Sequence, residues 1–151
     1  MIDKTDRKLI ALLQKDANLT AQDLGERLNL SASQAGRRRQ RLESSGIMQG
    51  AHARVDPTAL GLDVQAFIQV QMTGHSKEND ESFARLVRNT PAITAAFTLT
   101  GEADYLLRVW CGDLAGLHNL IQGILLPHPA VARVQSQIVM DQMKPDAPLP
   151  I

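Results

Sequence analysis

The stretch SASQAGRRRQRLESSG, running from Ser31 to Gly46, decides how the first part of the chain is organised. Ser31 is followed three residues later by Gln34, and such a pair can satisfy the free N–H groups at the start of a helix. Gly46 can take the left-handed backbone conformation that commonly ends a helix. The stretch is therefore predicted to be one capped helix.

The predicted helix has a basic face and a small apolar face. Arg37 and Arg41 share one side at ~100° per residue, and Arg38 lies at the edge of that side. Ala35 and Leu42 lie opposite and can pack against a core. A basic face can bind an anionic partner, but a solvated basic helix has the same pattern. The segments on either side decide between the two.

Two shorter helices are predicted before this one. Asp3 can cap a helix over residues 3–14, in which apolar residues recur at helical spacing. Thr20 with Asp23 is a second capping pair, and it opens a helix over residues 20–28. A very short turn then precedes the basic helix, and two helices joined in this way form a helix-turn-helix.

A helix-turn-helix places its second helix in the major groove of DNA, where exposed side chains near its start reach base edges. Arginine pairs bidentately with guanine and glutamine with adenine, and each such contact discriminates by ~1–3 kcal/mol. Residues 1–49 are therefore predicted to be a winged-type helix-turn-helix that binds double-stranded DNA. A three-helix module that binds protein is the alternative. The predicted DNA contacts are Ser31, Ser33, Gln34, Arg37, Arg38 and Arg41.

Composition and charge limit the class of protein. The chain has 151 residues and no formal net charge, but its first 54 residues carry ten basic and six acidic side chains. The remainder carries six basic and ten acidic ones, which indicates a basic module joined to an acidic one.

A single cysteine excludes a disulfide within the chain. No apolar run approaches the ~20 residues of a membrane span and no signal peptide opens the chain, so a cytoplasmic location is expected. No metal is expected either, because metal-ligand spacing is lacking among His52, His75, His118 and His128.

Residues 50–64 separate the two modules. Apolar and polar residues alternate loosely around this connector, so an extended linker strand is predicted, followed by a turn at Asp56-Pro57. His52 and Arg54 can reach a phosphate group, although solvated strand residues are the simpler interpretation.

The second module repeats itself with a period of 38 residues. Phe67 corresponds to Tyr105, and Pro91 corresponds to Pro129. Each half has the pattern of a strand, a helix and a strand, and two such halves joined by a hairpin give the β-α-β-β-α-β order of a ferredoxin-like fold. Residues 65–151 are therefore predicted to be a ferredoxin-like domain, and the whole chain to be of the α+β class.

Both helices of such a domain cover one face of the sheet and leave the other face open. Trp110 or Cys111 is expected on the open face, which a partner subunit would cover. Cys111 is interpreted as a small buried residue rather than a nucleophile, because no base accompanies it. One side of a strand is predicted to carry Ile93, Ala95, Phe97 and Leu99.

The hairpin TLTGEADYLLRV joins the two halves. Gly101 permits a tight backbone whose amides can face a ligand. Glu102 and Asp104 can bind an ammonium group, and without a nucleophile or a metal set they are a poor catalytic pair. A purely structural turn is the alternative.

With these motifs the chain resembles the Lrp/AsnC (feast/famine) family of transcription regulators. The resemblance runs from DKTDRKLIALLQ through RLESSGIMQG, DPTALGLD and TLTGEADYLL to PAVARVQSQIVM, and so covers nearly the whole chain. It implies an N-terminal helix-turn-helix that binds DNA and a C-terminal ferredoxin-like domain that dimerises through its sheet. Dimers of the family often assemble further, commonly into octamers, and small effectors, usually amino acids, bind between dimers.

The resemblance also implies which residues contact the effector. They lie in the glycine hairpin and on the last strand: Thr100, Gly101, Glu102, Ala103, Asp104, Ser136 and Gln137. Three residues in particular depart from the family pattern. Arg39 stands where an apolar residue is usual, and Ser136 stands where threonine is common. Gly36 lies inside the recognition helix, at a cost of up to ~1 kcal/mol relative to alanine.

The sequence therefore predicts a DNA-binding transcriptional regulator, without a cofactor, that responds to an amino acid or a related metabolite. The alternative is an architectural DNA-binding protein of the same fold that takes no effector. A small enzyme on the ferredoxin-like scaffold is the weakest hypothesis, because the sequence shows neither a nucleophile–base pair nor a metal set.

Overall fold

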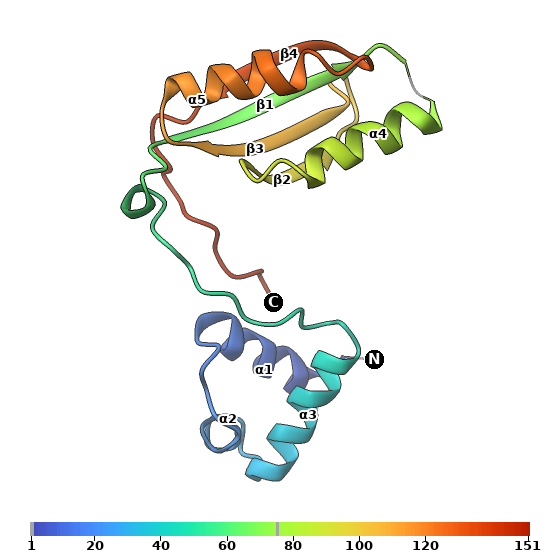
Figure 1. Cartoon of the computed structure of the whole chain (residues 1–151). Coiled ribbons are helices and arrows are strands. Elements are labelled where there is room, and N and C mark those ends of the chain that lie inside the picture. The colour runs from blue at the N-terminus through green and yellow to red at the C-terminus, as the bar shows by residue number, and fades with distance from the viewer. Residues whose placement is uncertain (1, 75) are drawn as a thin grey trace. The chain divides into compact units, whose positions relative to one another are not determined.

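Two compact units make up the chain in the computed structural model, which describes residues 2–74 and 76–151 (Figure 1). Unit 1 contains the residues up to Arg54 together with Met143–Ile151, and unit 2 contains Val55–Gln142. The last segment of the sequence thus belongs to unit 1, although it follows the last strand of unit 2.

Unit 1 is a bundle of three helices: α1 (Lys4–Lys15), α2 (Ala21–Leu28) and α3 (Ala32–Ser44). Each helix begins at a complete capping box, in which the cap and the third helical residue each bind the other's backbone N–H through a side chain. The caps are the predicted residues Asp3, Thr20 and Ser31. Gly46, just beyond α3, has the predicted left-handed backbone, with a φ of 73°.

The turn between α2 and α3 depends on two special backbone positions. Asn29 lies in the left-handed region, with a φ of 54°. The Leu30 N–H donates to the Gly25 carbonyl oxygen over 2.9 Å, and a Cβ atom at Gly25 would lie only 2.7 Å from the Leu30 carbonyl oxygen. Glycine is therefore needed at this position, because any side chain would collide with the backbone of the turn.

Apolar residues from all three helices form the core of unit 1. Its buried members are Leu9, Leu13, Leu19, Leu24, Ala35 and Leu42. Ala35 and Leu42 therefore face the core, as predicted. Residues 2–54 contain no strand, so the helix-turn-helix lacks the wing that its predicted type would have. The segment after α3, at 49–54, has no β-branched residue to favour a strand.

The connector after α3 has no regular structure before a single 3-10 turn, η1 (Thr58–Leu60). The Asp56 carboxylate accepts a hydrogen bond from the Thr58 N–H over 3.0 Å, which starts this turn at the predicted Asp-Pro step. The predicted linker strand does not form, since sheet pairing begins only at Val64. Val55 is 60% exposed and so gains no burial that would favour a strand.

Unit 2 is a four-stranded antiparallel sheet with two helices in β-α-β-β-α-β order. The strands are β1 (Val64–Met72), β2 (Ile93–Thr98), β3 (Tyr105–Cys111) and β4 (Val131–Ile138). The helices are α4 (Lys77–Arg88) and α5 (Leu114–Asn119), which continues into the π-helical segment η2 (Leu120–Leu125). The strand order β2-β3-β1-β4 confirms the predicted ferredoxin-like fold and the α+β class.

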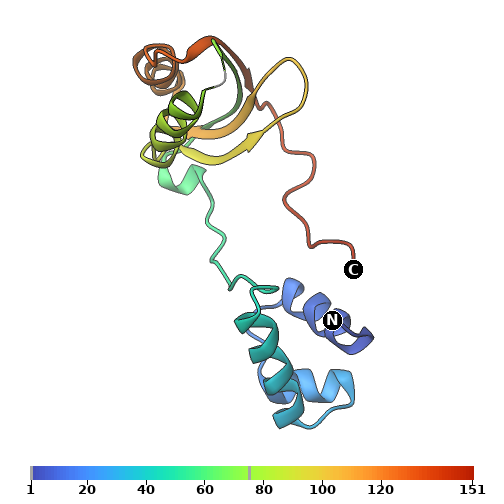
Figure 2. The same cartoon turned by 90° about the vertical axis from the view of Figure 1, so that its right-hand side faces the viewer.

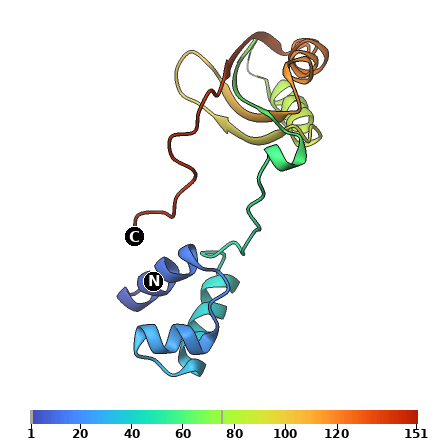
Figure 3. The ribbon, with the colours of Figure 1, turned by 90° about the vertical axis from the view of Figure 1, so that its left-hand side faces the viewer.

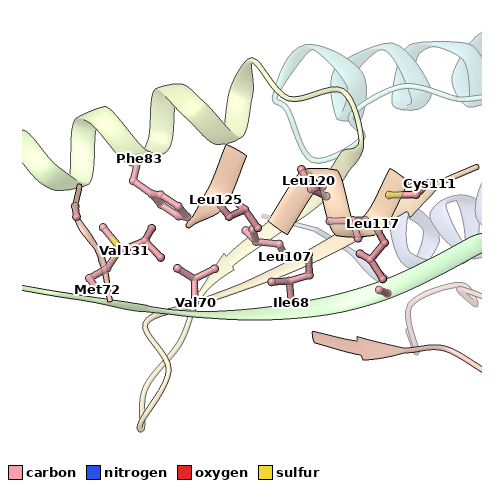
Figure 4. Packing of buried hydrophobic residues seen from close by; sticks show 13 residues of the cluster. Ile68, Val70, Met72, Phe83, Leu107, Cys111, Leu117, Leu120, Leu125 and Val131 are labelled. Atoms are coloured by element: carbon pink, nitrogen blue, oxygen red, sulfur yellow. The ribbon is translucent and has the colours of Figure 1, made fainter. Parts of the chain in front are cut away.

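Both helices cover the same face of the sheet, as Figure 2 and Figure 3 show from two sides. The core lies between this face and the helices, and Figure 4 shows Phe83 of α4 and Leu125 of η2 above Ile68, Val70 and Leu107 of the sheet. All five side chains are at most 1% exposed. The second face of the sheet is left without a helix.

Trp110 and Cys111 lie on opposite faces of the sheet, because successive residues of a strand alternate. Cys111 pairs with Val64, belongs to the core and is 5% exposed, whereas Trp110 lies on the open face. Of the two residues expected on the open face, only Trp110 is there. The burial of Cys111 confirms its interpretation as a small buried residue, and this burial raises the pKa of its thiol.

A β-bulge in β2 changes which of its residues share a face. Ile93 pairs with Val109 of the core, but Ala95 pairs with Arg108 of the open face, so the register shifts between them. Ile93 therefore packs against the core, while Ala95 and Phe97 lie on the open face. The prediction that every second residue from position 93 shares one side was wrong at Ile93, because a bulge inserts one residue into the alternation.

Candidate nucleic-acid interface and effector site

The start of α3 exposes four of the residues predicted to contact DNA: Ser31, Ser33, Gln34 and Arg37. The Ser31 N–H donates to Gln34 Oε1 over 3.1 Å, and the Gln34 N–H donates to Ser31 Oγ over 3.2 Å. This exchange fixes the Gln34 side chain through its oxygen and leaves its amide donors for a partner. Arg37 forms no ion pair with any residue that the structure describes.

Arg38 and Arg41 bind carboxylates of α1 and its cap. Arg38 Nη1 lies 2.6 Å from Asp3 Oδ2 and 2.7 Å from Asp6 Oδ1, and Arg41 Nη2 lies 2.6 Å from Asp6 Oδ2. The Asp6 side chain is 0% exposed, and a buried carboxylate needs such partners to offset its desolvation. Both arginines therefore connect α3 to α1 within unit 1.

Two members of these ion pairs, Asp3 and Arg38, have shifted pKa values that favour their charged forms. The backbone N–H of Asp6, and then the Arg38 guanidinium, hold the pKa of Asp3 below its usual value. The carboxylates of Asp3 and Asp6 raise the pKa of Arg38. The Arg41 side chain is 56% exposed and that of Arg38 only 28% exposed, so Arg41 is the more accessible to a phosphate group.

Arg39, for which the sequence predicted no role, binds the backbone of the loop between α1 and α2. Its Nη1 donates to the Leu19 carbonyl oxygen over 3.0 Å, and its Nε donates to Glu43 Oε1 over 2.9 Å. A polar contact to the loop backbone therefore takes the place of the apolar packing that is usual at this position. Gly36, the other departure in α3, is not required by packing: a Cβ atom there would lie 3.5 Å from the Ala21 Cβ, an ordinary van der Waals distance.

In unit 2, Asp104 fixes the glycine hairpin to β1. Its carboxylate accepts a hydrogen bond from the Met72 N–H over 2.7 Å, and its N–H donates to the Val70 carbonyl oxygen over 3.0 Å. Its carbonyl oxygen accepts from the Leu99 N–H over 2.8 Å. Gly101, at the tip, has a φ of 113°, a conformation that strains any other residue. The sequence thus placed the hairpin correctly, and Asp104 has a structural role in it.

Polar side chains of the open sheet face meet the hairpin at a cavity of about 40 Å³. Its walls are Gln69, Gln71, Glu102, Ala103, Arg133 and Gln135. Arg133 Nη1 lies 3.9 Å from Glu102 Oε1 in an exposed pair, so both charges remain accessible to a ligand. Sequence reasoning found Glu102 and Ala103 but missed the other four. The sequence does carry a signal for Gln69 and Gln71: these polar residues alternate with apolar ones along β1, and the apolar ones are buried, so both glutamines lie on the open face.

Ser136 and Gln137, the predicted contacts on the last strand, lie on opposite faces of β4. Ser136 pairs with Ile68 of the helix-covered face, and Gln137 pairs with Phe67 of the open face. Both are exposed, because β4 is an edge strand. Neither lines the hairpin cavity, and Thr100 does not line it either. One chain therefore brings together only part of the predicted effector set.

Two further titratable side chains of unit 2, Tyr105 and His128, bind neighbouring side chains. Tyr105 donates its hydroxyl to Asp80 Oδ1 over 3.3 Å, and burial, followed by the Asp80 charge, raises the pKa of the phenol. His128 Nε2 lies 3.0 Å from Ser82 Oγ. His75 lies outside the described residues. Within residues 2–74 and 76–151, no three His, Cys, Asp or Glu side chains gather in a way that could hold a metal ion.

Two known domains match the chain, one after the other. Residues 2–43 match the AsnC-type helix-turn-helix domain, and residues 65–149 match the Lrp/AsnC ligand binding domain. The chain belongs to the Lrp/AsnC family. This Lrp/AsnC chain is 36% identical over 151 residues to the DNA-binding transcriptional activator DecR of Escherichia coli strain K12, with 100% of the chain and 99% of DecR covered.

Two further comparisons cover nearly the whole chain. The leucine-responsive regulatory protein of Rhizobium meliloti is 31% identical over 143 residues, which cover 95% of this chain and 92% of that protein. A transcriptional regulator of Neisseria meningitidis, solved as a complex with L-Met, is 37% identical and superposes with a TM-score of 0.93. That alignment covers 99% of this chain and 97% of the Neisseria chain.

This Lrp/AsnC protein is therefore a DNA-binding transcriptional regulator with a ligand-binding domain, and its relatives are regulators rather than enzymes. Among the described residues, no helix has the length and apolar character needed to cross a bilayer.

Proposed function

We propose that this regulator binds an amino acid at the hairpin of unit 2 and that the bound amino acid changes operator affinity. The observation that carries the proposal is the exposed pair of Arg133 and Glu102 at the hairpin cavity. A guanidinium group suits a carboxylate and a carboxylate suits an ammonium group, so the pair matches both charges of an amino acid. The L-Met bound to the Neisseria relative supports the same ligand class.

We also propose that a second subunit completes this site. A cavity of 40 Å³ holds only about three water molecules, so one chain alone cannot enclose an amino acid. Contacts from a neighbouring chain would supply the missing walls, as the family resemblance implies. The proposed effector contacts on each chain are Thr100, Gly101, Glu102, Ala103, Asp104, Ser136 and Gln137, with Arg133 added from the structure.

Calorimetry with each of the twenty amino acids tests the proposal. We expect heat of binding from at least one amino acid at millimolar concentration, and loss of that heat in Gly101→Val. Gly61→Val is the matched control, because Gly61 also has a positive φ, 73°, and also has open space around its Cβ position. If no amino acid binds the unmutated protein, the proposal fails.

A second function, that of an architectural DNA-binding protein without an effector, is favoured by the small size of the cavity. Asp104 also uses its carboxylate for the backbone of β1 rather than for a ligand. This function predicts that operator affinity and assembly stay the same with every amino acid. The calorimetric series therefore discriminates between the two.

For DNA, we propose that the exposed start of α3 enters the major groove. Ser33, Gln34 and Arg37 would contact base edges, and Ser31 and Arg41 would contact phosphate groups. Arg38, at the edge of this face, would contact the DNA while it stays paired with Asp3 and Asp6. The support is the exposure of these residues, together with the absence of an ion pair at Arg37 within the described chain.

We propose that two chains pair through the open sheet face and that dimers assemble further, up to an octamer. Apolar side chains on this face are Phe67, Phe97, Leu106 and Trp110. Phe97 is 51% exposed in the single chain, which favours a partner at this face. Such a dimer would bind two half-sites about one helical turn apart, ~34–36 Å.

Sedimentation of Trp110→Glu tests the pairing, and we expect monomers, because the new charge would be buried at the contact. Leu114→Glu on α5, where the leucine is 61% exposed, is the control that stays dimeric. A Trp110→Glu protein that sediments as a dimer would refute the assignment of this face.

We further propose that residues 50–64 link the functional domains 1–49 and 65–151, and that the protein acts in the cytoplasm, where bacterial DNA lies.

A further inference from the structure

A cavity of about 510 Å³ lies in unit 1 beside α1. Its walls are mainly apolar, and they include Ile10 and Leu13 of α1 and Ile47 and Met48 of the segment after α3. None of the predicted DNA contacts lines it. Leu149, from the last segment of the sequence, does line it. The cavity is therefore separate from both proposed sites, and the chain itself supplies a residue to it.

The Gln14 side chain binds both backbone groups of Leu149. The Leu149 N–H donates to Gln14 Oε1 over 2.6 Å, and Gln14 Nε2 donates to the Leu149 carbonyl oxygen over 3.3 Å. A second connection lies nearby, since the Arg54 guanidinium donates to the Asp146 carbonyl oxygen over 2.9 Å. A side-chain amide that contacts both the N–H and the C=O of one residue recognises extended backbone, as a neighbouring strand does.

The composition of the segment suits this mode of binding. Pro148 and Pro150 flank Leu149, and proline has no backbone N–H. Leu149 therefore carries the one backbone donor between Ala147 and Ile151, and Gln14 binds that donor. Proline also fixes φ, so the segment loses less conformational entropy when it docks than a flexible segment would.

We propose that the surface of α1 at Gln14, on the rim of this cavity, is the docking site of segment 143–151 of the same chain, and that the docked segment is a second tether on the DNA-binding unit. The chain leaves unit 1 after Arg54 and returns to it at Met143. Docking therefore joins the two units through two segments, and release leaves only one. The Leu149 side chain is 72% exposed, so few apolar contacts oppose release. The tether does not depend on the identity of the effector.

Hydrogen–deuterium exchange of the full chain tests the docking. In Gln14→Ala we expect the Leu149 amide to exchange about tenfold faster than in the unmutated protein, because both hydrogen bonds are lost. Gln22→Ala is the matched control, since the side chain of this helical glutamine donates a hydrogen bond to Glu26, at 3.3 Å, and binds no residue of segment 143–151 within the described chain. Docking is refuted if the unmutated protein already exchanges Leu149 at the rate of Gln14→Ala.

A mixing experiment shows whether the segment docks on its own chain or on another copy. The Gln14→Ala chain, which keeps the segment, is mixed and reassembled with a chain that ends at Gln142 and keeps Gln14. Own-chain docking predicts that the Leu149 amide stays unprotected in the mixture. Recovered protection would show that the segment docks on a second copy and would overturn the proposal.

Operator affinity tests whether the docked segment acts as a tether. We expect Gln14→Ala to bind an operator selected in vitro about threefold to tenfold more weakly, because a less restrained unit loses more freedom on binding. Gln22→Ala should bind as the unmutated protein does. If Gln14→Ala loses protection at Leu149 but keeps its operator affinity, the segment docks without acting as a tether.

Discussion

Replacing Asp6 with alanine tests how α3 is positioned. The Asp6 carboxylate is fully buried and accepts hydrogen bonds from Arg38 over 2.7 Å, from Arg41 over 2.6 Å and from the Asp3 N–H over 3.2 Å. Removing one partner of a buried ion pair costs about 3–5 kcal/mol. Arg41 is 56% exposed and can regain water, and Arg38 keeps its ion pair with Asp3, so no unpaired buried charge remains. We therefore expect less than that range, about 2 kcal/mol in the free energy of unfolding of unit 1, for the lost hydrogen bonds.

The assay is exchange of α1 amides as urea is added, because it reports on unit 1 separately from the sheet of unit 2. Glu26→Ala is the control, since this exposed carboxylate of α2 accepts a hydrogen bond from Gln22 and forms no ion pair within the described residues, and we expect a change within about 0.5 kcal/mol. A loss below about 1 kcal/mol in Asp6→Ala would refute the view that this carboxylate fixes α3 on α1.

Three other perturbations give separate tests. In a binding titration, Arg37→Ala should weaken specific operator binding by ~1–3 kcal/mol, whereas Arg7→Ala on α1 should leave it unchanged. If both variants bind the operator with the same affinity, Arg37 does not contact the operator. Hydrogen bonds from Thr20, first from its hydroxyl and then from its backbone, lower the pKa of Asp23, so its stabilising effect is complete above the usual value of 3.8 and is lost as the pH falls through the folded-state value. Acid unfolding should therefore depend less on pH in Asp23→Asn, and an unchanged profile would contradict this. Burial raises the pKa of Tyr105, so its stabilising effect is complete below 10.0 and is lost as the pH rises through the folded-state value. Tyr105→Phe should remove that alkaline loss, and phenolate absorbance of the unmutated protein at the usual pKa would contradict the assignment.

The three helices of unit 1 and the repeated half-domains could be predicted because their signals are local. Each capping box uses residues three positions apart, and the sequence shows all of them. The repeat of 38 residues gives the strand and helix order directly. The faces of β2 could not be predicted, because the bulge after Ile93 follows from pairing with β3 rather than from β2 itself.

The partners of the α3 arginines depend on tertiary contacts. Helical spacing shows that Arg38 and Arg41 lie near the basic face of α3, but not that Asp6 of α1 lies opposite them. Arg133 meets Glu102 only after β4 has paired with β1, so the hairpin motif alone identified half of that charge pair. Contacts between distant segments, such as Gln14 with Leu149, leave no pattern in the sequence.

Operator binding measured with and without each amino acid is the most direct test of the central claim. The account predicts tight, sequence-specific binding that weakens with salt, and a shift in operator affinity with at least one amino acid at millimolar concentration. It also predicts that Gly101→Val binds the operator but loses the shift, while Gly61→Val keeps both. Specific binding that no amino acid changes would contradict the claim that this protein is an effector-responsive regulator.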